Sequence, residues 1–262
     1  MSAFDESIRE LRVEIDALRR RPDTPVREMR FAGPADALIE GLPVRVGPGA
    51  NPGILLRGDT AVELGNPEAG SCAGLLWTDD PSLVDDGAVT LLGPDLDAAD
   101  GCSLPFAQLV LVAGHDLTEE DHEALVQSQH ASDRIEGYMA RSTSEYVWSR
   151  VSHDALARGF DFEVLGRALL HLVKTAAPRP VSAEVVFVTT SRDDVVRLGD
   201  RAARAREIGR EIANELWRQR GFDLDCDFDC GSCSDQDVCD DIRDVIAATR
   251  RVAADAGTKR GR

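Results

Sequence analysis

The amino-terminal region shows a helical pattern of apolar and polar positions. Residues 4–21 carry an apolar side chain every three or four positions, with charged residues between them. The apolar positions are Phe4, Ile8, Leu11, Ile15 and Leu18. This spacing puts them on one face, so we predict an amphipathic helix whose apolar side is buried. Pro22 follows its end, and residues 22–40 are predicted to be a linker with a short helical turn.

Short apolar runs separated by turns follow, a pattern typical of β-strands. Strands are predicted at residues 42–46, 60–64, 88–92, 109–112, 146–151 and 181–189. The glycine-rich stretch at residues 47–53 matches no phosphate-binding motif. Its two prolines lack the backbone N–H groups that a phosphate would need, so we interpret it as a series of turns.

Longer amphipathic segments predict the remaining helices. They lie at residues 118–140, 152–159, 161–174, 192–219 and 237–254. Together these elements predict an α+β protein with a mixed sheet covered by helices and a short C-terminal cysteine module. We divide the chain into residues 1–40 (helix and linker), residues 41–200 (the α+β domain) and residues 201–262 (a helix, the cysteine module and a tail).

Composition narrows the possible partners and compartments. The 262 residues carry a formal net charge of -17, which would repel nucleic-acid phosphates. There are 30 aspartates but only two lysines, Lys174 and Lys259, and such an Asp-rich, Lys-poor composition suggests a halophilic source. We expect a cytoplasmic protein, because the N-terminus has no apolar signal core and no run is long enough to span a membrane.

Four of the six cysteines lie within fourteen residues and are the strongest chemical signal. Cys226, Cys230, Cys233 and Cys239 are spaced C-x3-C-x2-C-x5-C. Four soft thiolates suit either an iron–sulfur cluster or zinc. A [4Fe–4S] cluster is favoured, because zinc sites usually pair two short knuckles across a longer spacer. Two disulfides or an exposed loop of free thiols are the remaining alternatives, although clustered cysteines in a reducing compartment are more typically ligands.

The remaining cysteines, the histidines and the acidic residues give weaker indications of a functional site. Cys72 and Cys102 stand alone and are interpreted as small buried side chains. The five histidines, at 115, 122, 130, 153 and 171, have no acidic partner at a catalytic spacing. No Ser/His/Asp arrangement or carboxylate pair stands out, so catalytic residues stay unassigned. Aspartates flanking the cysteines would lower the reduction potential of a cluster.

The middle of the chain resembles a known family. The segment Ala88-Val-Thr-Leu-Leu-Gly-Pro-Asp-Leu-Asp97, then Ser103-Leu-Pro105 and Leu109-Val-Leu-Val-Ala-Gly114, is similar to the carbon monoxide dehydrogenase/acetyl-CoA synthase beta subunit. The likeness continues in a strand and helix whose matching positions are Trp148, Arg150, Ser152, Gly159, Phe160 and Gly166. It spans roughly residues 42–200, and implies the fold of the middle domain of acetyl-CoA synthase.

The resemblance also implies a ligand. The equivalent domain of the family presents arginines and a tryptophan toward CoA, so Trp148 and Arg150 become candidate CoA-binding residues, with Arg141, Arg158 and Arg167 nearby in sequence. Such side chains can hold phosphates and stack on adenine. The alternative is that Trp148 is a core aromatic and that the arginines are solvated, because arginine is the usual base throughout this chain.

Two departures from the family limit what the resemblance implies. Its cluster ligands begin with a C-x2-C pair like Cys230 and Cys233, but its later cysteines come further on than Cys239. The Cys-Gly-Cys tripeptide that chelates nickel there does not occur in these 262 residues, so we expect no complete nickel site. Cys226 as the fourth cubane ligand is our own assignment.

These observations lead to two functional hypotheses. The first is an iron–sulfur protein acting as an accessory or electron-transfer subunit in CoA-linked one-carbon or acyl chemistry, with a protein partner. Any enzymatic role would be within an acetyl-CoA synthase-like acyltransferase complex whose missing nickel ligands come from a second polypeptide. The second is a non-catalytic module that binds CoA or protein and is stabilised by structural zinc.

Overall fold

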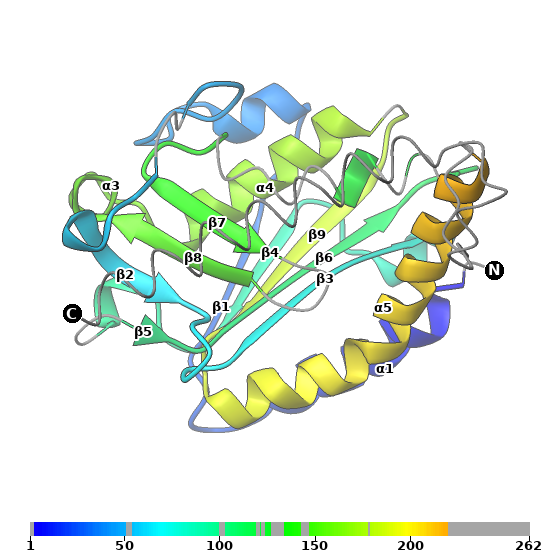
Figure 1. Cartoon of the computed structure of the whole chain (residues 1–262), viewed down its shortest axis with the longest axis horizontal. Helices are drawn as coiled ribbons and strands as arrows, with labels where there is room; N and C mark the ends of the chain where they lie inside the picture. The colour runs from blue at the N-terminus through cyan, green and yellow to red at the C-terminus, as the bar shows by residue number, and fades with distance from the viewer. Residues whose placement is uncertain are drawn as a thin grey trace, which may run out of the picture. The chain divides into compact units, whose positions relative to one another are not determined.

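The structure is a computed structural model of the chain. It describes residues 3–50, 54–99, 103–118, 121, 124–126, 134–142, 147–177 and 179–219. By its internal contacts the chain divides into two units, Met1–Leu216 and Trp217–Arg262. All of the elements below lie in the first unit, apart from the last turn of one helix. They form an α+β fold with two mixed sheets, as predicted (Figure 1).

A five-stranded sheet forms the centre of the first unit. Its strand order is β1 (Val26–Arg30), β4 (Ala88–Leu92), β9 (Ser182–Val188), β6 (Phe106–Ala113) and β3 (Ser71–Thr78). The pairs β4–β9 and β3–β6 are parallel, whereas β1–β4 and β6–β9 are antiparallel. Every residue of β4 and β6 is buried, which explains why both strands are almost entirely apolar rather than alternating.

A second sheet has four strands and one outward face. Its order is β5 (Ser103–Leu104), β2 (Thr60–Leu64), β8 (Val147–Ser152) and β7 (Tyr138–Ser142). Residues of β8 alternate between buried and half-buried positions. Val147 and Val151 enter the core, while Trp148 and Arg150 face the other way. Ser71 of β3 ties the two sheets together, because its hydroxyl donates to the Val147 carbonyl at 2.6 Å.

Helices cover both faces of the five-stranded sheet (Figure 1). One face packs against α1 (Asp5–Arg19) and α5 (Arg192–Gln219), and the apolar stripe predicted for residues 4–21 lies in this core. The other face packs against α4 (Phe162–Ala176) and the inner side of the small sheet. The short helix α3 (His153–Ala157) follows β8. Short 3-10 turns are η1 (Ala35–Ile39), η2 (Arg57–Asp59), η3 (Pro81–Leu83) and η4 (Leu96–Ala98).

Local capping explains where the helices begin. The Asp161 carboxylate accepts from the Val164 amide at 2.8 Å and caps α4, and Ser152 caps α3 in the same way. At the start of α5 the Ser191 hydroxyl accepts from the Asp194 amide at 3.2 Å and donates to its carboxylate. These side chains satisfy backbone N–H groups that the first turn of a helix leaves without partners.

A buried ion pair connects α1 to the middle of the large sheet. Glu184 of β9 is only 2% exposed, and its Oε1 accepts from Arg12 Nη1 at 2.6 Å. The second carboxylate oxygen accepts from the Asp85 amide at 2.8 Å. A carboxylate at this depth needs such partners, because burying it unpaired would cost several kcal/mol (~3–5).

The structure corrects several of the predicted elements. The helix predicted over 118–140 is wrong at its C-terminal end, because Tyr138–Ser142 forms the strand β7 and Ile135 makes a single bridge to Val46. Residues 42–46 contribute only that bridge and form no strand. Strands β1 and β3 were not predicted at all. The C-terminal helix predicted at 237–254 lies outside the described residues.

Gly166 in α4 tests whether close packing outweighs helix propensity at this position. A Cβ on Gly166 would lie 2.4 Å from Val89 Cγ1 of β4. We therefore expect Gly166→Ala to lower the free energy of unfolding by about 1–3 kcal/mol, although alanine favours helices by about 1 kcal/mol. Urea unfolding measures the change. The matched control is Gly199→Ala in α5, where the nearest atom is Cys72 Cβ at 4.0 Å and stability should rise. Equal gains in both variants would contradict this packing.

Candidate functional site

The two predicted CoA-binding residues lie together on the outer face of the small sheet. Trp148 and Arg150 are two positions apart on β8, so their side chains point to the same side. The Arg150 guanidinium carbon lies 4.5 Å from the centroid of the Trp148 ring. This is a cation–π contact, which is worth roughly 0.5–1 kcal/mol at an exposed site. Trp148 is therefore not a core aromatic, which was the alternative interpretation.

Glu63 of β2 holds this pair in place. It lies directly opposite Arg150 in the antiparallel β2–β8 pairing, and its Oε1 accepts from Arg150 Nε at 3.2 Å. Burial of Glu63 acts to raise its pKa, but hydrogen bonds from Asn66, Arg150 and Trp148 outweigh burial and lower the pKa. Glu63 therefore stays ionised at neutral pH and bonds both members of the pair.

The turn after β2 completes the polar row. Asn66 Nδ2 donates to Glu63 Oε2 at 3.3 Å and to Ser103 Oγ at 2.6 Å. The turn passes close to β8, because a Cβ on Gly65 would lie only 2.3 Å from the Val147 carbonyl oxygen. Gly65 also has a φ of 66°, so glycine is required here on both counts. The tight turn thus places Asn66 beside Glu63.

Arg150 keeps donors for a ligand. A guanidinium has five N–H groups. In the described part of the chain Nε donates to Glu63, and Nη1 donates to the Leu55 carbonyl at 3.2 Å. The side chain is 17% exposed, and no described residue accepts from Nη2. The surface therefore offers an aromatic ring, a partly engaged guanidinium and a carboxylate, which suits a planar anionic ligand.

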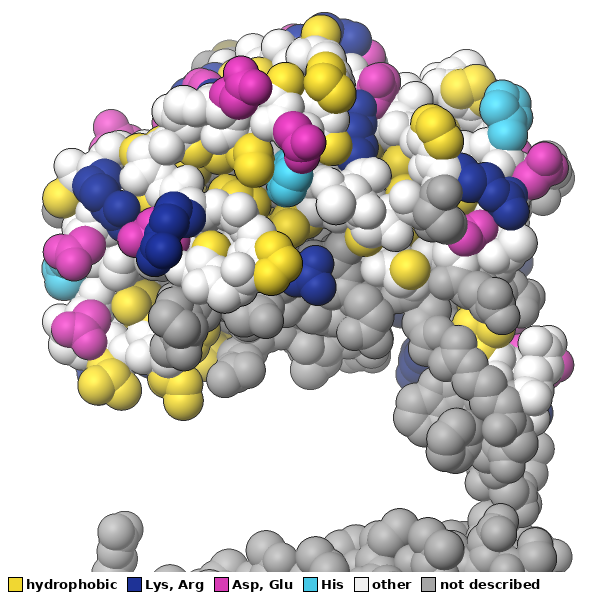
Figure 2. Space-filling model, turned by 90° about the horizontal axis from the view of Figure 1, so that it is seen from above, with side chains coloured by type: hydrophobic (Ala, Val, Ile, Leu, Met, Phe, Trp, Pro, Cys, Tyr) yellow, Lys and Arg dark blue, Asp and Glu magenta, His cyan; other side chains and the backbone are white. Residues whose placement is uncertain are grey.

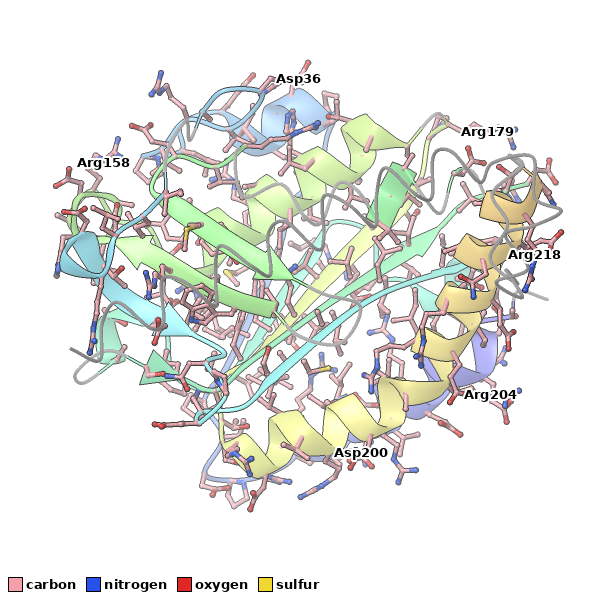
Figure 3. All side chains as sticks on the ribbon, viewed as in Figure 1. Asp36, Arg158, Arg179, Asp200, Arg204 and Arg218 are labelled. Atoms are coloured by element: carbon pink, nitrogen blue, oxygen red, sulfur yellow. The ribbon has the colours of Figure 1, made fainter. Side chains whose placement is uncertain are left out.

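Two of the other arginines that the resemblance drew in, Arg158 and Arg167, make their contacts away from Trp148. Arg158, labelled in Figure 3, lies at the α3 end of the molecule and reaches Glu136 at 3.4 Å. Arg167 of α4 donates to the Leu38 carbonyl at 2.8 Å and lies over the Phe31 ring. Arg141 of β7 is paired directly with Trp148 of β8, but the side chain of Arg141 lies outside the described residues. On the face that Figure 2 shows, acidic and basic side chains are interspersed rather than segregated.

The turn at residues 93–95 that carries part of the resemblance has a structural role. The Asp95 carboxylate accepts from Arg27 Nη1 at 2.7 Å and from the Phe162 amide at 3.2 Å, so it connects β1 to the start of α4. The Thr189 hydroxyl donates to the Pro94 carbonyl at 2.7 Å. Burial is the main cause that raises the pKa of Asp95. These contacts give the turn after β4 a structural role in joining β1, β9 and α4.

The described histidines lie at the periphery of the fold or in structural positions. His171 is buried in α4, with its Nδ1 2.9 Å from the Ala35 carbonyl oxygen. His153 begins α3. His115 lines a hollow of about 230 Å³ at the ends of β3 and β6, together with Asp79 and Ser182. His122 and His130 lie outside the described residues.

The predicted metal ligands lie outside the described residues as well. This holds for Cys226, Cys230, Cys233 and Cys239, and for Cys102. Cys72 is fully buried on β3, and burial raises the pKa of its thiol to about 12, as expected for a small core side chain. Among the described residues no group of three or more His, Cys, Asp or Glu side chains is placed to hold a metal ion.

Sequence comparison gives the family of the chain. The family model described as "CO dehydrogenase/acetyl-CoA synthase complex beta subunit" matches residues 42–195, which is more than half of the chain. The chain belongs to this family. The matched residues include both sheets apart from β1, together with α4 and the outer-face residues Glu63, Trp148 and Arg150. The resemblance seen in the sequence is therefore confirmed.

Several curated relatives agree with the family model. The beta subunit of the acetyl-CoA decarbonylase/synthase complex of Methanopyrus kandleri is 30% identical over 68% of this chain and 40% of the relative. A beta subunit from Methanosarcina mazei is 35% identical over 61% of this chain and 32% of the relative. The carbon monoxide dehydrogenase/acetyl-CoA synthase subunit alpha of Moorella thermoacetica is 29% identical over 68% of this chain but 23% of its own length. The aligned region thus spans two fifths or less of these relatives.

Sequence reasoning found the tryptophan and one arginine of the outer face but missed Glu63, Asn66 and Ser103. Glu63 stands at an outward position of a predicted strand, next to a Gly-Asn-Pro turn. That charged residue was a usable signal, but its partner on β8 lies 87 positions away.

Within the described residues, no helix has the length and apolar character needed to cross a membrane.

The pKa of Glu63 predicts a pH-dependent contribution to stability. A carboxylate whose pKa is lowered on folding contributes stability that is fully present above its unfolded value, here 4.5, and that is lost as the pH falls through the folded pKa. We expect Glu63→Gln to lower the free energy of unfolding by about 1 kcal/mol at pH 7. The difference from the native chain should vanish toward pH 3.

Urea unfolding between pH 3 and pH 7 measures this difference. The control is the same substitution in an Arg150→Gln background, where the effect at pH 7 should shrink because the ionic partner is gone. A constant difference across the whole pH range would show that Glu63 acts through packing rather than charge.

Proposed function

We propose that this chain is an iron–sulfur protein that serves as an accessory or electron-transfer subunit in CoA-linked one-carbon or acyl chemistry. The observation that carries the proposal is membership of the CO dehydrogenase/acetyl-CoA synthase beta-subunit family, in a chain that also holds four clustered cysteines. The printed names of the relatives describe subunits of a complex, which supports a protein partner for this chain.

The proposed cluster ligands are Cys226, Cys230, Cys233 and Cys239. The chemistry of this donor set fits a [4Fe–4S] cluster, since four thiolates complete the coordination of four irons. When bound, such a cluster supplies one-electron redox chemistry. The five aspartates within the segment 225–237 would add negative charge around it and favour a low reduction potential. We propose no nickel site, because the 262 residues contain no Cys-Gly-Cys.

The proposed ligand of the outer face is CoA. Trp148 offers a ring for the adenine, and Arg150 offers a guanidinium for a phosphate. Support comes from their 4.5 Å contact on the matched part of the chain. The binding surface and the proposed cluster ligands belong to different segments, so each part of the proposal can be tested alone.

The competing function is a non-catalytic module stabilised by zinc. The same four thiolates would satisfy tetrahedral zinc, which carries no redox chemistry. This alternative keeps the CoA or protein binding of the outer face but removes any electron-transfer role. Metal content separates the two functions directly.

Metal analysis of the full chain tests the proposed cluster. After anaerobic purification we expect about four irons per chain, visible absorbance and a reducible paramagnetic signal after dithionite. Changing any one of Cys226, Cys230, Cys233 or Cys239 to serine should abolish iron loading. The controls are Cys72→Ser and Cys102→Ala, which should load iron normally. One zinc per chain, with no visible absorbance, would instead establish the zinc module.

A further inference from the structure

Glu63 occupies the centre of the outer face rather than its edge. Its neighbours across the sheet are Ser103 on β5 and Arg150 on β8. Its carboxylate accepts hydrogen bonds from Asn66, Arg150 and Trp148. The tryptophan, Arg150 and Asn66 therefore all contact this carboxylate.

The carboxylate changes the charge that a ligand encounters. Arg150 contributes one positive charge and Glu63 one negative charge, so the pair is neutral overall. Only 17% of the arginine and 26% of the glutamate side chain are exposed, so solvent screens the pair less than it would at a free surface. A ligand with a single negative charge would exchange one carboxylate contact for another and gain little from Arg150.

The carboxylate also occupies part of the arginine fork. A phosphate binds a guanidinium best through two parallel N–H groups. Glu63 holds the Nε group, while Leu55 holds Nη1. Nη2 has no acceptor among the described residues, whereas a phosphate reaches the Nε edge only by displacing Glu63. Because the pair is neutral overall, charge alone attracts an anion little, and a ring that stacks on Trp148 must supply the rest of the binding.

We propose that Glu63 is a specificity-determining residue of this surface. It positions Arg150 against Trp148 in the ligand-free chain and weakens the binding of anions, so that charge alone does not hold a ligand and a ring that stacks on Trp148 is required. This inference rests on the proposed binding of CoA at Trp148 and Arg150. It assigns to Glu63 a role that is separate from contact with the ligand.

The test is isothermal titration of the full chain with CoA and with adenosine, which has the ring but no phosphate. Glu63→Gln keeps an oxygen acceptor at the same position and removes the charge. We expect it to bind CoA about three- to tenfold more tightly, and this gain should shrink at high salt. Adenosine binding should not change. The matched control is Glu68→Gln, an exposed acid with no ion pair among the described residues, which should bind CoA like the native chain.

A second pair of variants provides a check that does not depend on replacing Glu63. Ser103 is exposed on the short edge strand β5, opposite Glu63. Ser103→Asp adds a negative charge there, and Ser103→Asn adds the same shape without charge. We expect CoA to bind Ser103→Asp at least about threefold more weakly than Ser103→Asn. Equal binding by the two, or equal or weaker CoA binding by Glu63→Gln, would overturn the role of Glu63.

Failure of the underlying proposal would look different. Trp148→Phe and Arg150→Gln should each weaken CoA binding if this surface is the binding site. Should both bind CoA as tightly as the native chain, CoA binds elsewhere and the proposed site is wrong, whatever Glu63→Gln does. Absence of CoA binding in the native chain and in every variant would overturn both proposals.

Discussion

The central strand β9 is the element on which the rest of the fold depends. It pairs with β4 on one side and with β6 on the other, and six of its seven residues are buried. Val186 and Val188 face α1 and α5, while Val185 and Phe187 face α4 and the small sheet. Its single charged residue, Glu184, is paired with Arg12, which orients α1. Two cores and three helices are therefore organised around one strand by burial on both of its faces.

The candidate site lies on the small sheet because only one face of that sheet packs against the core. Its inner face adds Val62, Val147 and Val151 to the core beside α4, and strand alternation then directs Glu63, Trp148 and Arg150 outward. The strands supply rigid backbone positions for these side chains. Hydrogen bonds among them fix the orientation of the guanidinium over the ring. A binding surface on paired strands holds its geometry better than one built on a loop.

The proposed function joins two segments with different evidence. The matched domain belongs to a family whose curated members are named as subunits of acetyl-CoA decarbonylase/synthase complexes. The cysteine cluster is a feature of sequence alone, and its chemistry admits iron–sulfur or zinc. The chain carries a net charge of -17 and as a whole repels a polyanion. The proposed binding of CoA would therefore depend on a local site.

The sequence by itself determined the class of fold, the helices α1, α4 and α5, the buried runs of β4, β6 and β9, and the family, because each is a local pattern or a short motif. It also identified Trp148 and Arg150 through the resemblance. Tertiary structure alone decided that Tyr138–Ser142 is a strand, since β8 supplies the hydrogen-bond partners of that segment. It likewise decided that Glu63 faces Arg150 and that Gly166 packs against Val89. Those contacts join residues far apart in the chain, and strand register, which no local pattern encodes, brings them together.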